Sequence, residues 1–339
     1  MYMPAEWERQ WGIQLIWPHQ CTDWNPILQE ITATYLLMAG AIVEHERLLV
    51  VAQETEPVRQ LFQEAGIDIS RVVFHECSIN DTWARDSGFI TLKSSDQRGV
   101  ASLLDFKFNG WGEKFEASKD NAINQSLYQF IFSKSHQYVS NLDFVLEGGS
   151  IESDGMGTVF TTTGCLMASH RNQPLTQQQI EQELKQRLHA HRIMWIDHGH
   201  LAGDDTDGHI DTLVRIAPND TLLYVACDNK EDEHYSDLKL MEQQLLSFRT
   251  IQGKPYRLIG LPMPDPIYDD GERLPATYAN FLIINDAVLV PTYGQSVNDE
   301  RAIQLIQQAF PDHAMVPIDS CSIIRQHGSI HCCTMQFFE

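Results

Sequence analysis

The sequence lacks the features of a disulfide-rich, exported or membrane-spanning protein. Its seven cysteines form no CxxC pair and their number is odd, which is typical of a reduced intracellular chain. The first residues, MYMPAEWERQWG, carry charges where a signal peptide needs an apolar run. The longest apolar run, at 35–43, is shorter than the roughly 20 residues that cross a bilayer. We therefore expect a cytoplasmic protein that does not contact a membrane.

Basic residues are also scarce. The chain has 24 Lys and Arg against 46 Asp and Glu, which gives a formal net charge of −22. Such a charge repels nucleic acid and attracts cationic ligands, so we expect no nucleic-acid partner. No linker or low-complexity stretch divides the 339 residues. We expect one domain over 1–339.

A loose internal repeat is present instead of a linker. Segments that begin at Asp86, Glu147, His209 and Phe281 each read as strand, turn, strand, helix and strand. The steps between them are 61, 62 and 72 residues. One supersecondary unit per period is typical of a stacked or closed repeat architecture.

The two chain ends complete a fifth unit. The N-terminal part has two strands and a helix but lacks one inner strand, which the C-terminal stretch can supply. We therefore predict an α/β fold of five ββαβ modules, a propeller with pseudo-fivefold symmetry and the active site on its central axis. The alternative is an ordinary doubly wound sheet.

In such a ring the residues that open the first strand of each module converge. The openings contain titratable side chains that are far apart in sequence: Asp86, Glu147, His209 with Asp211, and His331 with Cys332. Two glycines after Glu147 permit close approach of the backbone. Each signal is weak alone, because Asp86 also reads as a turn cap and Glu147 as part of an ordinary loop.

The stretch 197–216 is rich in histidine and acidic residues. His198, His200 and Asp205 suggest a zinc site, because His-x-His with a later Asp can ligate this metal. A strand reading of the segment favours another account. His209 and Asp211 are two residues apart, so in a strand they point to the same side and flank one small ligand.

Two adjacent cysteines follow His331 near the end of the chain. In a strand Cys332 and Cys333 face opposite ways, so one can pack in a core while the other does chemistry. A lone cysteine is usually structural. The case for Cys332 therefore depends on the histidine and carboxylates that the ring would bring to it.

One cysteine, one histidine and several carboxylates suit a guanidinium substrate. This planar cation binds carboxylates through paired hydrogen bonds. A thiolate can attack its central carbon, and a histidine can protonate the departing ammonia and then activate water. The bound cation itself favours the thiolate. No metal or cofactor is needed for this chemistry.

Five ordered stretches carry a resemblance that runs nearly end to end. They are MPAEWERQWGIQLIWPH, NDTWARDSG, LEGGSIESDG, DDTDGHIDT and GSIHCCTMQ. Through them the chain resembles the agmatine deiminase and bacterial-type peptidylarginine deiminase family of the guanidine-modifying superfamily. That resemblance implies the five-module α/β propeller.

The resemblance also implies roles for named residues. Cys332 would be the nucleophile and His209 the general acid and base, with Glu147 bonded to that histidine. Asp86 and Asp211 would clamp the guanidinium.

Further residues would shape the pocket. Trp83 would line it beside the alkyl chain, and Asp205 would face the distal amine. Cys333 would pack inward. The sequence departs from the family where His327 and Ser329 replace glycines in the run before IHC, which bears on the substrate.

We therefore expect a metal-independent hydrolase that converts agmatine to N-carbamoylputrescine and ammonia through a covalent cysteine intermediate. The first alternative is a peptidylarginine deiminase that produces citrulline. The others are a metal-dependent hydrolase built on His198, His200 and Asp205, and a binding propeller without catalysis. The sequence leaves the existence of a homo-oligomer open.

Overall fold

The computed structural model describes residues 1–96 and 99–338 and has a mixed α/β fold. Within these residues the strands form five sheets of three or four strands and one two-stranded ribbon. A doubly wound sheet, the alternative from the sequence, is wrong because the strands do not join into one large sheet.

Four of the sheets share one pairing order, in which the first strand is antiparallel to the second and the second is parallel to the third. These sheets are β4 (Ile90–Leu92), β5 (Ser102–Lys107) and β6 (Gln137–Val145); β7 (Ile151–Ser153), β8 (Thr158–Thr162) and β9 (Arg192–Ile196); β10 (Val214–Ala217), β11 (Thr221–Ala226) and β12 (Arg257–Pro262); and β15 (Leu282–Ile284), β16 (Ala287–Thr292) and β17 (Ala314–Asp319). The repeat read from the sequence corresponds to these four sheets.

The fifth sheet joins the two ends of the chain. Its strands, in order, are β18 (Thr334–Phe338), β1 (Gln10–Ile16), β2 (Arg47–Ala52) and β3 (Val72–Glu76). Strand β18 is antiparallel to β1, and Ile13 lies opposite Gln336. The expectation that a C-terminal strand completes the N-terminal unit is confirmed. The ribbon, β13 (Tyr268–Asp269) with β14 (Glu272–Arg273), lies between the last two of the four repeated units.

Short turns connect the paired antiparallel strands of the hairpins. Asn285 and Asp286 alone connect β15 to β16, since Ile284 pairs with Ala287. Asp286 has a φ of 64°, and Asn219 and Asp220 before β11 are also left-handed. Asn and Asp tolerate this conformation better than most residues, which explains the Asn-Asp pairs at both turns.

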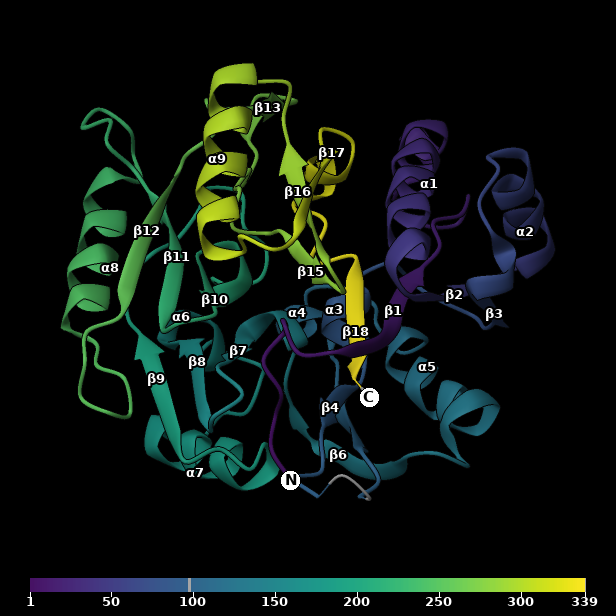
Figure 1. Ribbon diagram of the computed structural model, residues 1–339, viewed down its shortest axis with the longest axis horizontal. Coiled ribbons are helices and arrows are strands. Elements are labelled where there is room, and N and C mark those ends of the chain that lie inside the picture. Colours follow the sequence, from purple (N-terminus) through teal and green to yellow (C-terminus); the bar gives the residue numbers. More distant parts are fainter. Residues whose placement is uncertain (97–98, 339) are drawn as a thin grey trace.

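In each of the five larger sheets, one longer helix connects the second and third strands. These helices are α1 (Leu28–His45), α5 (Asp120–Leu127), α7 (Gln177–Arg187), α8 (Tyr235–Ser247) and α9 (Ser296–Ala309), and α2 (Thr55–Glu64) precedes β3. They lie on the outside of the molecule, with the strands toward its middle (Figure 1). The amphipathic pattern of each helix places its apolar face on the adjoining sheet.

Helix α1 is long and apolar. Among the described residues one segment, Asn25–His45, would be long and apolar enough to cross a membrane by length and composition alone. Its residues Tyr35, Met38 and Ile42 are fully buried and share one core with Leu48 of β2. This is the behaviour of a core helix in a globular protein. The absence of membrane contact stays a prediction.

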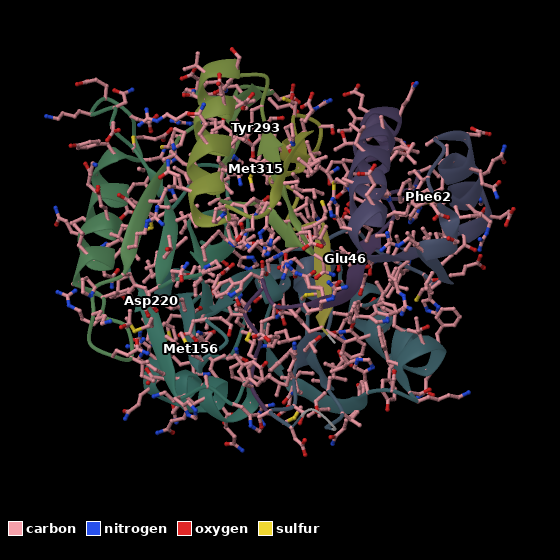
Figure 2. All side chains as sticks on the ribbon, viewed as in Figure 1. Glu46, Phe62, Met156, Asp220, Tyr293 and Met315 are labelled. Carbon is pink, nitrogen blue, oxygen red and sulfur yellow. The ribbon has the colours of Figure 1, made fainter. Side chains whose placement is uncertain are left out.

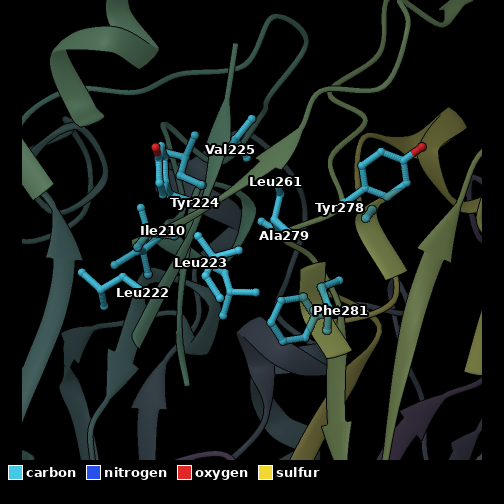
Figure 3. Packing of buried hydrophobic residues seen from close by; sticks show 14 of the residues in the cluster. Ile210, Leu222, Leu223, Tyr224, Val225, Leu261, Tyr278, Ala279 and Phe281 are labelled. Atoms are coloured by element: carbon cyan, nitrogen blue, oxygen red, sulfur yellow. The ribbon is translucent and has the colours of Figure 1, made fainter. Parts of the chain in front are cut away.

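Side chains fill the space between the sheets and the helices (Figure 2). Figure 3 shows buried side chains of β11 near Ala279 and Phe281, which lead into β15. Each fully buried Leu or Phe contributes about 1.5–3 kcal/mol through removal from water. Neighbouring sheets are thus joined by apolar packing, which fixes the segments that precede their first strands.

The buried carboxyl group of Glu46, labelled in Figure 2, also joins two units. It follows α1 and accepts hydrogen bonds from the backbone and side-chain nitrogens of Asn285 at 3.1 and 3.3 Å. Burial raises its pKa to about 7. This contact ties the first helix to the turn between β15 and β16.

Candidate active site

A cavity of about 320 Å³ lies where the segments before the first strands meet. Cys332 and Asp86 line its inner part, and Trp83, Trp111 and Phe115 form an aromatic wall. His209 and Asp211 lie behind this lining and are almost completely buried. Four of the predicted residues therefore meet at one place although they span 247 positions, from 86 to 332.

The candidate residues lie in short helical turns and not in strands. Asp86 is in α3 (Ala84–Ser87), Glu147 precedes the 3-10 turn Gly148–Ser150, and Asp211 is in the 3-10 turn Ile210–Thr212. Residues 330–333 form a turn before β18. The strand alternation used for the two cysteines, and for His209 and Asp211, is therefore wrong.

A hydroxyl group closes each of these turns, which gives the physical reason for them. Ser150 donates to the carbonyl of Glu147 at 2.6 Å, and Thr212 donates to that of His209 at 2.8 Å. Thr334 donates to the carbonyl of His331 at 3.0 Å. Ser and Thr side chains offer the backbone such local bonds in place of strand pairing. The spacing of three residues is visible in EGGS, HIDT and HCCT and is the signal that the strand reading missed.

Asp86 and His209 form a close pair. His209 Nδ1 lies 3.6 Å from Asp86 Oδ1. Asp86 also accepts hydrogen bonds from Trp111 Nε1 at 3.0 Å and from the Gly149 nitrogen at 3.2 Å. Burial opposes the charge of His209, but Asp86, Cys165 and Glu147 together outweigh it and raise the histidine pKa to about 10. Burial raises the pKa of Asp86 to about 6, against the opposing effect of His209.

Gly149 lies directly against this pair. A Cβ atom at this position would be 2.6 Å from His209 Nδ1, 2.9 Å from Asp86 Oδ1 and 3.1 Å from Asp211 Oδ2. Every other residue type would displace these groups, so a glycine is required here. The close backbone approach expected from the Gly-Gly pair is confirmed.

Cys332 faces Asp211 and Asn280. Its Sγ lies 3.9 Å from Asp211 Oδ2 and 3.4 Å from Asn280 Oδ1. Burial, followed by the charges of Asp211 and Asp86, raises the pKa of the Cys332 thiol well above its ordinary value. Burial also opposes ionisation of Asp211, but the hydrogen bond to His331 and the positive charges of His331, His209 and Arg215 together outweigh this effect and lower the pKa of the carboxyl group. Cys333 is buried in the apolar cluster that contains Tyr35, which fits a packing role.

Glu147 does not make the expected hydrogen bond to His209. Its two oxygens accept from Arg171 Nε at 3.0 and 3.3 Å. Among residues 1–96 and 99–338, both ring nitrogens of His209 are buried without a hydrogen-bond partner. The buried guanidinium of Arg171 requires an anion, and Glu147 supplies it. Glu147 still lies beside the ring, since its carboxylate is within 4.8 Å of a His209 nitrogen.

The cavity mouth has both signs of charge. Asp23, Asp81 and Asp205 line it, as do Arg325 and His327. His327 Nδ1 lies 3.6 Å from Asp205 Oδ2 and also contacts the carbonyl of Gly203. The loop with the unusual His327 therefore reaches across to the loop that contains Asp205.

Trp83 lines the cavity as expected. It also limits which residue can occupy position 328 in the loop that contains His327. Its ring packs at an angle against Trp24 and Trp111. A Cβ atom at Gly328 would lie 2.1 Å from the Trp83 ring, so the loop is held against the tryptophan only because residue 328 is glycine.

The three residues of the zinc hypothesis have separate partners. His198 lies 3.6 Å from Asp237, His200 packs near the ring of His234, and Asp205 faces His327. In the part of the chain that the structure describes, they do not form a cluster of ligating atoms. The zinc hypothesis for these three residues is therefore wrong.

Sequence reasoning missed Asn280, Arg171, Trp111 and Glu6. Asn280 immediately precedes Phe281, which marks the fourth repeat, so the repeat count could have found it. Its Oδ1 accepts from the backbone nitrogens of His331 and Cys332 and thereby holds the cysteine turn. No local signal distinguishes the others, because their roles depend on contacts with distant segments.

Comparison with known proteins gives full-length matches. The family model for Porphyromonas-type peptidyl-arginine deiminase matches residues 2–337. The agmatine deiminase of Stutzerimonas stutzeri is 30% identical over 360 residues, which cover 99% of this chain and 95% of that protein.

Two solved structures also match the whole chain. A cysteine-to-serine variant of the C. jejuni agmatine deiminase with substrate bound is 37% identical, with a TM-score of 0.90 and coverage of 100% of this chain and 96% of that one. A Porphyromonas gingivalis protein, provisionally assigned as an arginine deiminase, is 45% identical, with a TM-score of 0.93 and coverage of 100% and 98%. The chain belongs to the Porphyromonas-type peptidyl-arginine deiminase family.

Proposed function

We propose that this chain is a hydrolase that deiminates agmatine to N-carbamoylputrescine and ammonia, with Cys332 as the nucleophile. One observation carries the proposal: a thiol, an imidazole and two carboxylates from three distant segments meet at one buried cavity. Similarity to agmatine deiminases over the full length supports the same activity.

The carboxylates suit the substrate. Asp86 and Asp211 would each bind one edge of the guanidinium, and Asp211 Oδ1 has no partner within the described part of the chain. Asp205 at the mouth would bind the distal ammonium, and the aromatic wall around Trp83 would cover the alkyl chain. A cation with two charges matches an acidic cavity in an acidic protein.

The reaction has two stages. Cys332 Sγ forms a bond to the central guanidinium carbon, the C–N bond breaks, and ammonia leaves with a proton from His209. In the second stage His209 accepts a proton from water, the water oxygen bonds to the same carbon, and the C–S bond breaks. The net change is replacement of one amino group by oxygen, with release of ammonia.

The protonation states fit this order. The raised pKa of Cys332 means that the thiol is protonated before substrate binds. A guanidinium held beside the sulfur stabilises the thiolate, and the thiol proton passes to solvent, so the nucleophile forms where its target is present. His209, with a pKa of about 10, is protonated at neutral pH and is ready to act as the acid.

For the fold we propose a five-module propeller in one deiminase domain, 1–339. Five sheets with related strand order and helices on the outside support this arrangement. The active site would lie on the pseudo-fivefold axis, because the turns that open the modules supply its residues.

We also propose that the protein is cytoplasmic, needs no metal or cofactor, and binds neither nucleic acid nor a membrane. Whether it forms a homo-oligomer is left open. Peptidylarginine deimination to citrulline is the alternative activity. It would use the same catalytic residues, and Arg325 and His327 at the mouth could bind a substrate carboxylate.

Ammonia release from the purified protein tests the proposal. Agmatine, free arginine and a peptide with C-terminal arginine are supplied separately, with and without a chelator. We expect release from agmatine that the chelator does not reduce. Release from the peptide alone would assign the chain as a peptidylarginine deiminase, and loss with the chelator would contradict the metal-independent mechanism.

A further inference from the structure

A second cluster of charged side chains lies behind Asp211, on the side away from the cavity. Its centre is Glu6, from the N-terminal stretch MPAEWERQWG, which the proposed reaction does not use. Glu6 lies 3.0 Å from Arg85 Nη1 and forms a short ion pair with Arg215. Its Oε1 is 2.8 Å from His331 Nε2.

His331 connects this cluster to the proposed substrate site. Its Nδ1 lies 2.7 Å from Asp211 Oδ2, and the side chain is fully buried. A neutral imidazole has one N–H group and can donate to one of two carboxylates only. With Glu6 at Nε2 and Asp211 at Nδ1, only the doubly protonated imidazolium can donate to both carboxylates.

The charge count of the cluster agrees with this form of His331. Glu6, Asp211 and Glu152 supply three negative charges, and Glu152 pairs with Arg215. Arg85 and Arg215 supply two positive charges, so a charged His331 makes the sum zero. Arg215 Nη2 is 3.1 Å from His331 Nε2, and the Glu6 carboxylate contacts both cations and offsets their repulsion.

Other charged groups approach Asp211 from the cavity side. Asp86, which already interacts with the Glu147 carboxylate, disfavours its negative charge, whereas His209 favours it. A third carboxylate would be costly to ionise in this setting without a nearby cation. His331 supplies that cation at Asp211 Oδ2, and Asp211 Oδ1 has no hydrogen-bond partner within residues 1–96 and 99–338.

We propose that Glu6 is a positioning residue: it keeps His331 charged and fixed, and His331 in turn keeps Asp211 ionised and oriented for the guanidinium. The proposal rests on the proposed function, because it gives Asp211 the role of substrate clamp. It assigns the N-terminal arm a part in substrate binding although the arm does not line the cavity.

The test compares Glu6→Gln with the parent and with Glu8→Gln. Glu8 is on the same arm but bonds to Tyr2 and Lys93, away from His331. Initial rates of ammonia release from agmatine give kcat and KM between pH 5.5 and 9, and thermal unfolding is followed for each protein. A further pair, His331→Gln alone and combined with Glu6→Gln, completes a double-mutant cycle.

We expect Glu6→Gln to raise KM about 10- to 100-fold, as loss of the outer partner of a site ligand typically does, with a smaller change in kcat. The pH profile of kcat/KM should change as well, because removal of the Glu6 charge alters the electrostatic surroundings of His331 and Asp211. Combination with His331→Gln should add no further loss, since both changes break one chain of contacts. Glu8→Gln should keep the parent's KM.

A Glu6 that only stabilises the fold would give a different result. If Glu6→Gln unfolds at lower temperature but, while folded, keeps the parent's KM and pH profile, the positioning role is wrong. If the parent itself releases no ammonia from agmatine, the proposed function fails and this inference falls with it. The parent's rate therefore separates the two failures.

Discussion

The two sides of Asp211 are built differently. In the front group, next to the cavity, both ring nitrogens of His209 and Asp211 Oδ1 are buried polar atoms without a hydrogen-bond partner within residues 1–96 and 99–338, although His209 Nδ1 lies 3.6 Å from Asp86 Oδ1. On the rear side, Glu6, Glu152, Arg85 and Arg215 are joined in ion pairs. Buried polar groups without partners are costly, and proteins retain them mainly where function needs them. The rear pairs hold in place the groups that the front leaves for a ligand.

This comparison predicts that changes at the front mainly reduce activity, whereas changes at the rear mainly reduce stability, except at Glu6, which also acts on KM through His331. The largest effect should come from Cys332→Ala, because loss of the nucleophile removes the covalent route. We expect turnover of agmatine to fall about 10⁴-fold or more, while binding measured by calorimetry persists. The matched control is Cys333→Ser, which should keep most activity. An inactive Cys333→Ser with an active Cys332→Ser would move the nucleophile by one position.

The next largest effect should come from the clamp. Asp86→Asn and Asp211→Asn each remove a negative charge that would contact the guanidinium. We expect kcat/KM for agmatine to fall about 10²- to 10³-fold, the usual size for loss of one electrostatic partner in a buried site. Binding should weaken together with the rate. Near-normal kinetics in either variant would exclude that carboxylate from the clamp.

At the rear, Glu152→Gln should mainly affect stability. Glu152 pairs with the buried Arg215 and accepts from the backbone nitrogen of Ile216 at 3.1 Å. Removal of one partner of a buried pair typically costs about 3–5 kcal/mol. Urea unfolding should show this loss, and KM should change less than in Glu6→Gln. A large rise in KM without a change in unfolding free energy would break the division between front and rear.

The pH profile gives a smaller effect at the front. Asp86 must be ionised to bind the substrate, and its pKa is about 6, so kcat/KM should fall as the pH drops through 6. Trp111 donates to Asp86 Oδ2 and favours the ionised form. Trp111→Phe should therefore move this acid limb to higher pH, by up to about one unit. A limb that stays in place would show that another group controls it.

The smallest effect should come from the mouth, where His327 competes with the substrate for Asp205. His327→Gly should raise the preference for agmatine over butylguanidine, which lacks the distal amine, by about two- to fivefold, since an exposed ion pair contributes about 0.2–1 kcal/mol. Both substrates share the reacting group, so their ratio cancels changes in catalysis. An unchanged ratio would place the distal amine elsewhere.

The sequence was sufficient to predict the features of the fold that follow from its internal repeat and its pattern of strands and helices. The repeat predicted the succession of strands and helix in four units, and the missing strand predicted that β18 would join the N-terminal unit. It failed where local geometry depends on a single hydroxyl group: Thr212 and Thr334 close turns at positions that the apolar pattern assigned to strands. It also could not show that Arg171 would bind Glu147 from 24 residues away. Such contacts depend on which segments the whole fold brings together.

The measurement that tests the central claim most directly is mass spectrometry of the protein quenched in acid during turnover of agmatine. The account predicts an adduct with the mass of agmatine less one ammonia, on the peptide that contains Cys332. Further fragmentation should place the adduct on Cys332 and not on Cys333, and Cys332→Ala should show none. Turnover at the parent's rate by Cys332→Ala, or an adduct on Cys333, would contradict it.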